Sequence, residues 1–230
     1  MHVLWENWQA LAWGFGRTLA LTVLSYALAL GVGTIMAIFR VSPVHILRAV
    51  GTCYVEFFRN IPLLTLMVLV VFGLPDAGVR LGLFASAVLA ICLSSGAFVC
   101  ETIRSGINTV GVGQSEAARS LGLNMVQQLR YVILPQAFMA MISPLVNVFI
   151  GTLIGTSLAS AVGVAELTNV TQQLNVKYAE AVILFLVSGV IYVAVALGGS
   201  KFGTYLQRKV GSPGLSKGSR QVMLEGGGPQ

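Results

Sequence analysis

Long apolar runs separated by short polar segments make up most of the 230-residue chain. A helix that crosses a membrane needs about 20 predominantly apolar residues, and the runs reach that length. We therefore predict five transmembrane helices, over about 14–39, 50–74, 81–100, 135–161 and 178–199. The second run is the least regular, because Glu56, Arg59 and Asn60 interrupt it before Pro62.

The composition supports an all-α integral membrane protein. The mean hydropathy is +0.83, 56% of the residues are hydrophobic and only 10% are charged, against about 25% charged residues in ordinary soluble domains. We expect one membrane domain over residues 1–210. Residues 211–230 are rich in Gly, Ser and Pro without apolar periodicity, and we expect them to form a disordered cytoplasmic tail.

The distribution of Lys and Arg predicts the orientation. Cytoplasmic loops are enriched in these residues, and alternate loops divide them 11 to 3, with Arg17, Arg80 and Lys177 in the smaller set. The N-terminus is therefore expected outside, and the C-terminus and the polar loop at 105–135 are expected in the cytoplasm. The basic residues are spread along the membrane boundary rather than gathered on one face, so the charge of +6 does not indicate nucleic-acid binding.

The chain carries few signs of its own chemistry. None of the four lysines lies in a P-loop, so nucleotide hydrolysis by that route is excluded. The one G-x-S-x-G string, at 214–218, lies in the polar tail without a strand–turn–helix context. Cys53, Cys92, Cys100, His2 and His45 lack the spacing of a metal site or disulfide framework. We therefore expect no catalytic residue, metal or cofactor in this chain.

The polar segment 115–136 is predicted to form two helices joined at a glycine. Glu116 to Arg119 are good helix formers, and Gly122 suits a left-handed helix end. Asn124 and Gln127 have the spacing of a capping box, and an apolar stripe follows until Pro135, where we expect the second helix to end. From these features alone, a loop packed back on the membrane domain is as good an interpretation as a docking helix.

The residues of this segment resemble the EAA loop of ABC-importer permeases, E-A-A-x3-G-x9-I-x-L-P, with Val132 where isoleucine is usual. The resemblance implies a type I importer permease fold, in which the loop docks in a cleft of a cytoplasmic ABC ATPase dimer. That partner would bind ATP and Mg. The residues implied to couple the two proteins are Glu116, Ala117, Ala118, Arg119, Gly122 and Pro135.

Three further segments are similar to permeases for polar amino acids: 56–64 (EFFRNIPLL), 101–107 (ETIRSGI) and 156–167 (TSLASAVGVAEL). Segments 40–44 and 105–110 are most similar to glutamate-importing members. The resemblance implies a multi-pass protein of the bacterial cytoplasmic membrane that works with a second permease subunit, identical or homologous, and an extracytoplasmic substrate-binding protein. Ile154, Gly155 and Met139 depart from the family pattern, in which Lys with Asp or Asn, and often Arg, occupy these positions.

Polar residues inside apolar runs are the candidates for the substrate path, since ionisable groups in a membrane are functional candidates by default. These candidates are Arg59, Asn60, Asn147, Thr156 and Ser157. The alternative is structural: Glu56 with Arg59, and Glu101 with Arg104, have the spacing of i,i+3 ion pairs, and hydroxyl groups bond back to their own helix.

Other features indicate packing and external contacts. Gly151 with Gly155, and Gly199 with Gly203, form G-x-x-x-G steps that favour close helix packing, including a permease dimer seam. On the outer side, Asp76 and Arg80, and also Glu166, Lys177 and Glu180, are candidates to face a substrate-binding protein.

The apolar pattern and the resemblance together favour ATP-driven import of a polar amino acid, with glutamate first and glutamine or another zwitterion next. The alternative function is that of a permease for another small polar solute. A gradient-driven transporter would show internal repeats, which are not evident here. A membrane enzyme would need a nucleophile, an acid–base pair or a metal cluster, and none has suitable spacing.

Overall fold

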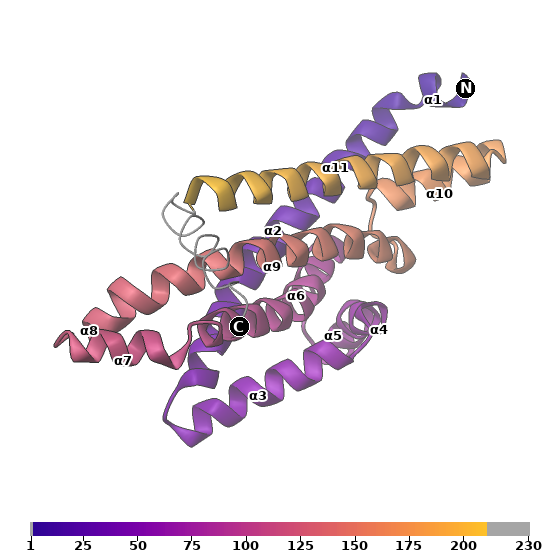
Figure 1. Ribbon diagram of the computed structural model, residues 1–230. Coiled ribbons are helices and arrows are strands. Elements are labelled where there is room, and N and C mark those ends of the chain that lie inside the picture. The colour runs from indigo at the N-terminus through magenta and orange to yellow at the C-terminus, as the bar shows by residue number, and fades with distance from the viewer. Residues whose placement is uncertain (1, 211–230) are drawn as a thin grey trace, which may run out of the picture.

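The computed structural model describes residues 2–210, and the regular structure in this range is helical throughout (Figure 1). The predicted tail at 211–230 lies outside the described residues. The elements in chain order are α1 (His2–Glu6), α2 (Trp8–Val41), α3 (His45–Asn60), α4 (Leu63–Val68), the π-helix η1 (Leu69–Gly73), α5 (Leu74–Asp76), α6 (Leu83–Asn108), α7 (Val112–Ser120), α8 (Met125–Gln128), the π-helix η2 (Leu129–Ile133), α9 (Leu134–Gly155), the 3-10 helix η3 (Thr156–Val162), α10 (Leu167–Tyr178) and α11 (Ala181–Val210).

Four continuous helical stretches among the described residues are long and apolar enough to cross a membrane: Trp8–Val41, Leu83–Asn108, Met125–Val162 and Ala181–Lys209. A fifth span is present if α3 and the segment Leu63–Asp76 are counted together, but these two are bent by 105°. The bend lies at Ile61, whose backbone is extended (φ −81°, ψ 130°), as expected for a residue before proline. The irregular second span of the sequence is therefore a broken one.

Helix α6 forms the centre of the bundle. It packs against α2, α9, α3 and α4, and 67% of its most apolar window is buried, against 11% for α11. Small side chains make this possible, because they let helix backbones approach closely. At Gly33 of α2, a Cβ atom would lie 2.6 Å from the Gly96 carbonyl oxygen and from Val99 on α6.

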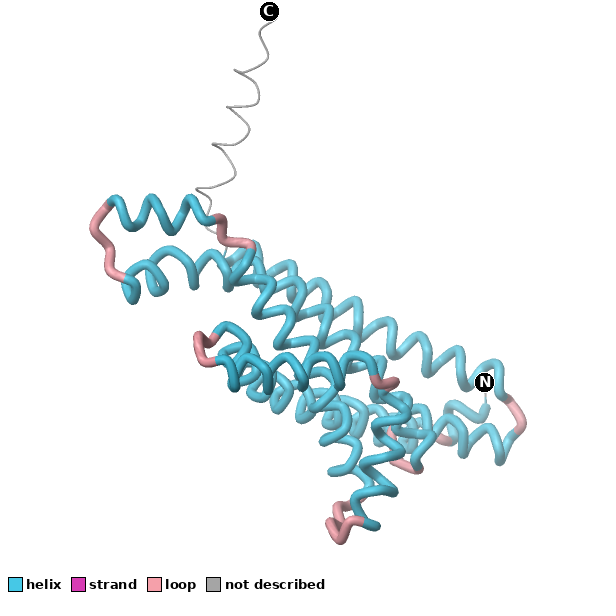
Figure 2. Tube along the Cα trace, turned by 90° about the horizontal axis from the view of Figure 1, so that it is seen from below, coloured by secondary structure: helices cyan, strands magenta, loops and turns pink. Residues whose placement is uncertain are grey.

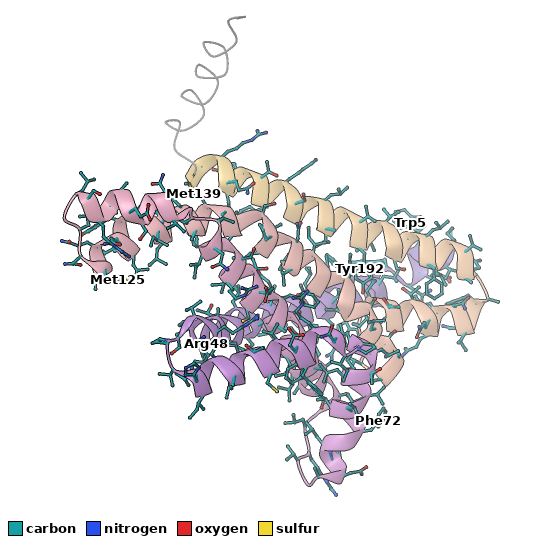
Figure 3. All side chains as sticks on the ribbon, turned by 60° about the horizontal axis from the view of Figure 1, so that its bottom comes forward. Trp5, Arg48, Phe72, Met125, Met139 and Tyr192 are labelled. Carbon is teal, nitrogen blue, oxygen red and sulfur yellow. The ribbon has the colours of Figure 1, made fainter. Side chains whose placement is uncertain are left out.

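The second G-x-x-x-G step packs inside the chain. A Cβ at Gly203 of α11 would lie 2.6 Å from Val146 of α9, and Gly199 faces Phe149 of the same helix. The expected close packing is thus confirmed at this step between α11 and α9 (Figure 3). In the first step, Gly155 lies against Leu63, and Gly151 has no neighbour within 4 Å of a Cβ position.

Glu166 is the capping residue of α10 and is fully buried, with 0% exposure. It accepts hydrogen bonds from the backbone N–H groups of Thr168 (2.9 Å) and Asn169 (2.8 Å), from the Tyr192 hydroxyl (2.9 Å) and from the Thr18 hydroxyl (3.2 Å). Burial raises the pKa of this carboxyl, and the four donors oppose the rise. The expectation that Glu166 faces an external protein is wrong, because the carboxylate instead joins α10 to α2 and α11.

Candidate functional site

The first helix of the polar loop ends at a glycine, as predicted. Gly122 has φ +78°, in the left-handed region that glycine adopts without strain. Its N–H donates to the Arg119 carbonyl (2.9 Å), and the Leu123 N–H donates to the Ala118 carbonyl (3.2 Å). These two bonds form a Schellman motif, which satisfies carbonyl groups at the end of α7.

The second helix begins where the sequence predicts and continues further. Asn124 and Gln127 form the expected capping box, with side-chain to backbone bonds of 3.0 and 2.9 Å. Pro135 does not end this helix, so that prediction is wrong. The preceding turn is a π-helix, in which the Leu134 N–H bonds the Leu129 carbonyl five residues back. This wider turn accommodates a proline without a break in the helix.

The two loop helices are tied together by Gln128, which is only 3% exposed. Its Nε2 donates to the Leu123 carbonyl (2.7 Å), and its Oε1 accepts a bond from the Ser115 hydroxyl (3.2 Å). The loop projects beyond the bundle as a helical hairpin (Figure 2). Because α8, η2 and α9 are one continuous helical stretch, a force on the hairpin reaches the membrane helices directly.

The surface of α7 carries charges without partners. Glu116, Ala117 and Arg119 are exposed, while Ala118 faces inward with 3% exposure. Within residues 2–210, neither Glu116 nor Arg119 takes part in an ion pair. Beside them, Leu121, Met125 and Val126 are exposed apolar side chains. The hairpin thus presents a mixed charged and apolar surface of the kind that binds another protein.

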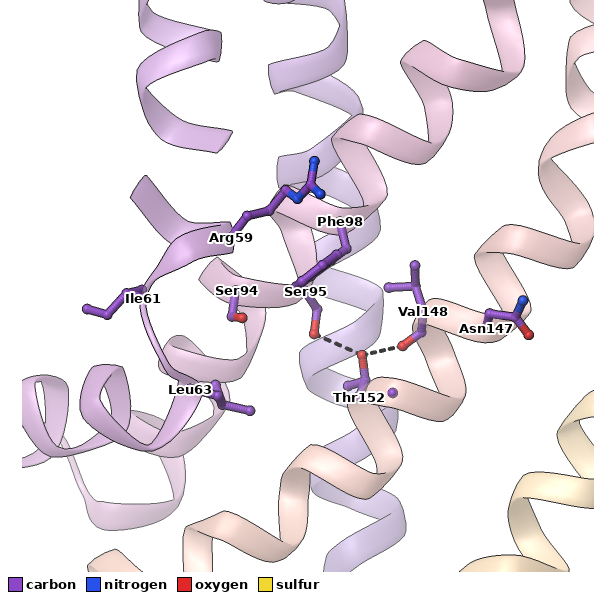
Figure 4. Close-up of a pocket in the computed structure, with 10 residues that line it drawn as sticks. Arg59, Ile61, Leu63, Ser94, Ser95, Phe98, Asn147, Val148 and Thr152 are labelled. Atoms are coloured by element: carbon purple, nitrogen blue, oxygen red, sulfur yellow. Dashed lines mark hydrogen bonds between the residues drawn. The ribbon is translucent and has the colours of Figure 1, made fainter. Parts of the chain in front are cut away.

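A pocket of about 520 Å³ lies between α3, α6 and α9 (Figure 4). It brings together two residues that the sequence singled out, Arg59 and Asn147. Its other lining residues are Ile61, Leu63, Ser94, Ser95, Phe98, Val148, Gly151 and Thr152. The Thr152 hydroxyl donates to the Val148 carbonyl (2.8 Å), so the Ser95 hydroxyl, 2.8 Å away, donates to Thr152. The volume falls in the range of small-molecule sites, about 300 to 1,000 Å³.

The other three candidate path residues lie outside this lining. Asn60 donates to the Glu56 carbonyl (2.6 Å), Thr156 is buried and donates to the Leu153 carbonyl (2.6 Å), and Ser157 donates to the Ile154 carbonyl (2.7 Å). All three make the local bonds of the structural alternative, and their role in a path stays a prediction. Sequence reasoning missed Ser94, Ser95 and Thr152, although hydroxyl groups inside apolar runs are the signal that pointed to Thr156.

The two predicted ion pairs have different outcomes. Glu101 binds Arg104 on its own helix, with 3.2 Å from Nε to Oε1, and it also binds Arg40 of α2, a partner that the sequence did not indicate. Glu56 and Arg59 form no ion pair in the structure. Instead the Arg59 guanidinium lies 5.6 Å from the centre of the Phe98 ring. Arg59 is therefore a positive charge on the pocket wall without an acidic partner in the described chain.

Comparison with known protein families explains why one chain has both a projecting loop hairpin and a 520 Å³ pocket among its apolar helices. Residues 29–212 match the family described as the binding-protein-dependent transport system inner membrane component. The chain belongs to this family. It is a multi-pass protein of the bacterial cytoplasmic membrane and the permease subunit of an ABC importer. The family membership implies a separate ATPase and a substrate-binding protein as partners.

Relatives of this permease agree with that assignment. It is 42% identical over 182 residues to the glutamate transport system permease protein GluC of Corynebacterium efficiens, covering 72% of this chain and 78% of GluC. It is 38% identical over 167 residues to the probable glutamine ABC transporter permease protein GlnM of Bacillus subtilis, covering 73% and 77%. A crystal structure of an amino acid ABC transporter with histidines superposes with a TM-score of 0.85 and 31% identity, covering 90% of this chain and 96% of the other.

Proposed function

We propose that this permease imports polar amino acids, with glutamate favoured, and that it works with a cytoplasmic ABC ATPase dimer, a second permease subunit and an extracytoplasmic substrate-binding protein. The names of the relatives, which include glutamate and glutamine transporters, support an amino-acid substrate. The observation that carries the preference for glutamate is Arg59, the one charged side chain that lines the 520 Å³ pocket.

An arginine in this position favours an acidic cargo. Arg59 is exposed at the end of α3, and no acidic side chain of the described chain forms an ion pair with it. A carboxylate in the pocket would supply the missing charge through two parallel N–H···O bonds, the strongest type of neutralising contact for a guanidinium. Ser94 and Ser95 line the same pocket, and their hydroxyl oxygens offer hydrogen bonds to the remaining polar groups of an amino acid.

Coupling to ATP hydrolysis is assigned to the loop hairpin. In this proposal α7 docks in the partner ATPase through Glu116, Ala117, Ala118 and Arg119, while Gly122 sets the corner. Pro135 lies in the helix that continues into the membrane. Closure of the ATPase dimer around ATP and Mg then shifts the membrane helices between inward-facing and outward-facing populations, because the nucleotide binds the two states with different affinity. The N-terminus is placed outside on the distribution of Lys and Arg.

Glutamine is the next candidate substrate. It shares the size of glutamate and the α-carboxylate, so Arg59 can also bind it, and one relative is named for glutamine transport. The two substrates differ in the side-chain carboxylate. Only glutamate offers Arg59 a second anionic group, which makes charge selectivity the property to measure.

The test is uptake of labelled glutamate, glutamine, arginine and histidine into proteoliposomes that hold this chain and its partner subunits, with ATP inside. We expect the wild type to prefer glutamate, and Arg59→Gln to lower glutamate uptake about tenfold or more relative to glutamine, since a charge-assisted pair is worth about 1.5 to 3 kcal/mol. Arg48→Gln removes an exposed arginine of the same helix and serves as the control. Equal losses for all four substrates in Arg59→Gln would contradict the assignment.

A further inference from the structure

Two pockets follow one another along the pair of helices α6 and α9. The 520 Å³ pocket lies at Ser94 to Phe98 of α6 and at Asn147 to Thr152 of α9. A second pocket, of about 260 Å³, lies at 98–109 of α6, and on α9 it is lined by Ala140 and Pro144. Residue numbers therefore rise along α6 and fall along α9 from the first pocket to the second. In the predicted orientation, this direction leads from mid-membrane toward the cytoplasm.

Arg59 and Phe98 are the two residues that line both pockets. They come from different helices and contact each other, with 5.6 Å from the guanidinium carbon to the ring centre. Phe98 is 43% exposed, while its neighbours over 91–100 of α6 are buried or half-buried. An exposed phenyl ring that lines both pockets and lies against an arginine without an acidic partner in the described chain is not explained by core packing.

The location of Arg59 makes the contact movable. It is the penultimate residue of α3, two positions before the extended residue Ile61 and the 105° bend into the next helical segment. The Arg59 side chain is exposed, so a change of its rotamer displaces the guanidinium from the ring while the Tyr54 hydroxyl still holds α3 to the Leu93 carbonyl of α6 at 2.7 Å. Phe98 is fixed by comparison, because α6 is the most buried of the continuous spans.

We propose that the Arg59–Phe98 contact is the gate between the two pockets, and that an anionic cargo opens it by binding the guanidinium in place of the ring. The proposal rests on the function proposed above. A bidentate carboxylate is a stronger partner for a guanidinium than an aromatic face. Every amino acid has an α-carboxylate that can displace the ring, and glutamate offers a second one in its side chain, so the same residue favours the acidic cargo and controls its passage.

The second pocket suits an anion that has passed the gate. Its acidic residue, Glu101, is already held by Arg40 and Arg104, so its charge does not repel the cargo. Hydroxyl groups of Thr102, Ser105 and Thr109 belong to the lining. Pro144 has no N–H to donate to the Ala140 carbonyl, and both residues line this pocket, which leaves an acceptor available there for the ammonium group of an amino acid.

The test measures leakage rather than uptake. Proteoliposomes with the permease and its ATPase are loaded with a trace of labelled glutamate, too dilute to hold the wild-type gate open, and efflux is followed without ATP. We expect Phe98→Ala to leak faster than wild type by roughly twofold to fivefold, the change in the closed-to-open ratio that corresponds to one exposed cation–π contact. Arg59→Gln should leak as well, because it removes the other half of the gate. Phe72→Ala replaces an exposed phenylalanine of η1 (Figure 3) that lines neither pocket, and it is the matched control.

Separate outcomes identify separate failures. If the wild type imports no amino acid with ATP, the proposed function fails and the gate fails with it. A second outcome is that the wild type imports glutamate, while Phe98→Ala and Phe98→Leu release it no faster than wild type and have wild-type melting temperatures. In that case the gate is wrong and the proposed function stands. Phe98→Leu keeps an apolar side chain without the ring face, so it should leak even if the alanine variant does not fold.

Discussion

The Ser115 hydroxyl lies 3.2 Å from Gln128 Oε1 and joins the two helices of the loop hairpin. Gln128 also donates to the Leu123 carbonyl at 2.7 Å, so one buried side chain connects α7, the glycine corner and α8. A hairpin that transmits force between two proteins has to keep its two helices in a fixed relation. We infer that Gln128 is the residue that keeps them so.

Replacement of Gln128 by Ala should loosen the hairpin. The change removes two hydrogen bonds at a buried position and is expected to cost about 1 to 2 kcal/mol of local stability. Amide hydrogen exchange over 112–128 should then quicken by roughly tenfold, with slower ATP-driven uptake. Gln114→Ala removes an exposed glutamine of α7 that makes no side-chain hydrogen bond in the structure, and exchange in that variant should match the wild type.

Gly122→Ala should weaken binding of the ATPase. At φ +78° a Cβ atom strains the backbone, which costs about 1 kcal/mol. The strain displaces the corner between α7 and α8, and the apparent affinity for the ATPase, measured by titration in nanodiscs, should fall several-fold. Gly78→Ala introduces the same strain at φ +86° between α5 and α6. An equal loss of affinity in both variants would show that the effect is not specific to the hairpin.

Glu166→Ala should destabilise the end of the bundle where α10 packs against α2 and α11. The variant leaves two backbone N–H groups and two hydroxyl groups without their acceptor, and we expect a loss of about 3 kcal/mol or more. Tyr192→Phe removes only one of the four donors and should cost about 1 kcal/mol. Thermal melting in detergent measures both. Melting temperatures equal to wild type in both variants would mean that the carboxylate does not hold α10, α2 and α11 together.

Glu101→Gln should destabilise the contact between α2 and α6. Arg40 is only 14% exposed, and loss of the carboxylate leaves two arginines without their shared anion. Because the site is partly solvated, we expect a cost of about 1 to 2 kcal/mol rather than that of a fully buried pair. Glu56→Gln is the natural comparison, since Glu56 has the same i,i+3 spacing to an arginine but forms no ion pair. The melting temperature of that variant should stay near the wild-type value.

Local rules predicted the hairpin well because its signals act over a few residues. A glycine at a helix end and an Asn–Gln capping box are set by backbone bonding, and both formed as expected at Gly122 and Asn124. Pro135 was misjudged for a related reason. The rule that proline ends a helix assumes regular α-helical bonding, and the π-helical turn at Leu129–Ile133 changes that bonding before the proline is reached.

Contacts between distant segments could not be predicted from the sequence. Nothing in the spacing of Arg40 indicates that it binds Glu101, 61 positions later, and Arg59 was equally consistent with an ion pair to Glu56. The burial of Glu166 depends on donors from three helices. The path candidates Arg59 and Asn147 could be predicted as polar residues in apolar runs, but their meeting in one pocket depends on how α3 and α9 pack against α6.

The most direct measurement compares wild type with Glu116→Lys in proteoliposomes that contain the partner subunits, with ATP inside, while co-purification of the ATPase is scored on the same preparations. We expect Glu116→Lys to lose both ATP-driven uptake and the bound ATPase. The control is Glu180→Lys, a charge reversal at an exposed glutamate between α10 and α11, at the opposite end of the molecule (Figure 1), which should keep the ATPase bound. Unchanged uptake and co-purification in Glu116→Lys, or uptake by this chain alone without ATP, would contradict the coupling role of the hairpin.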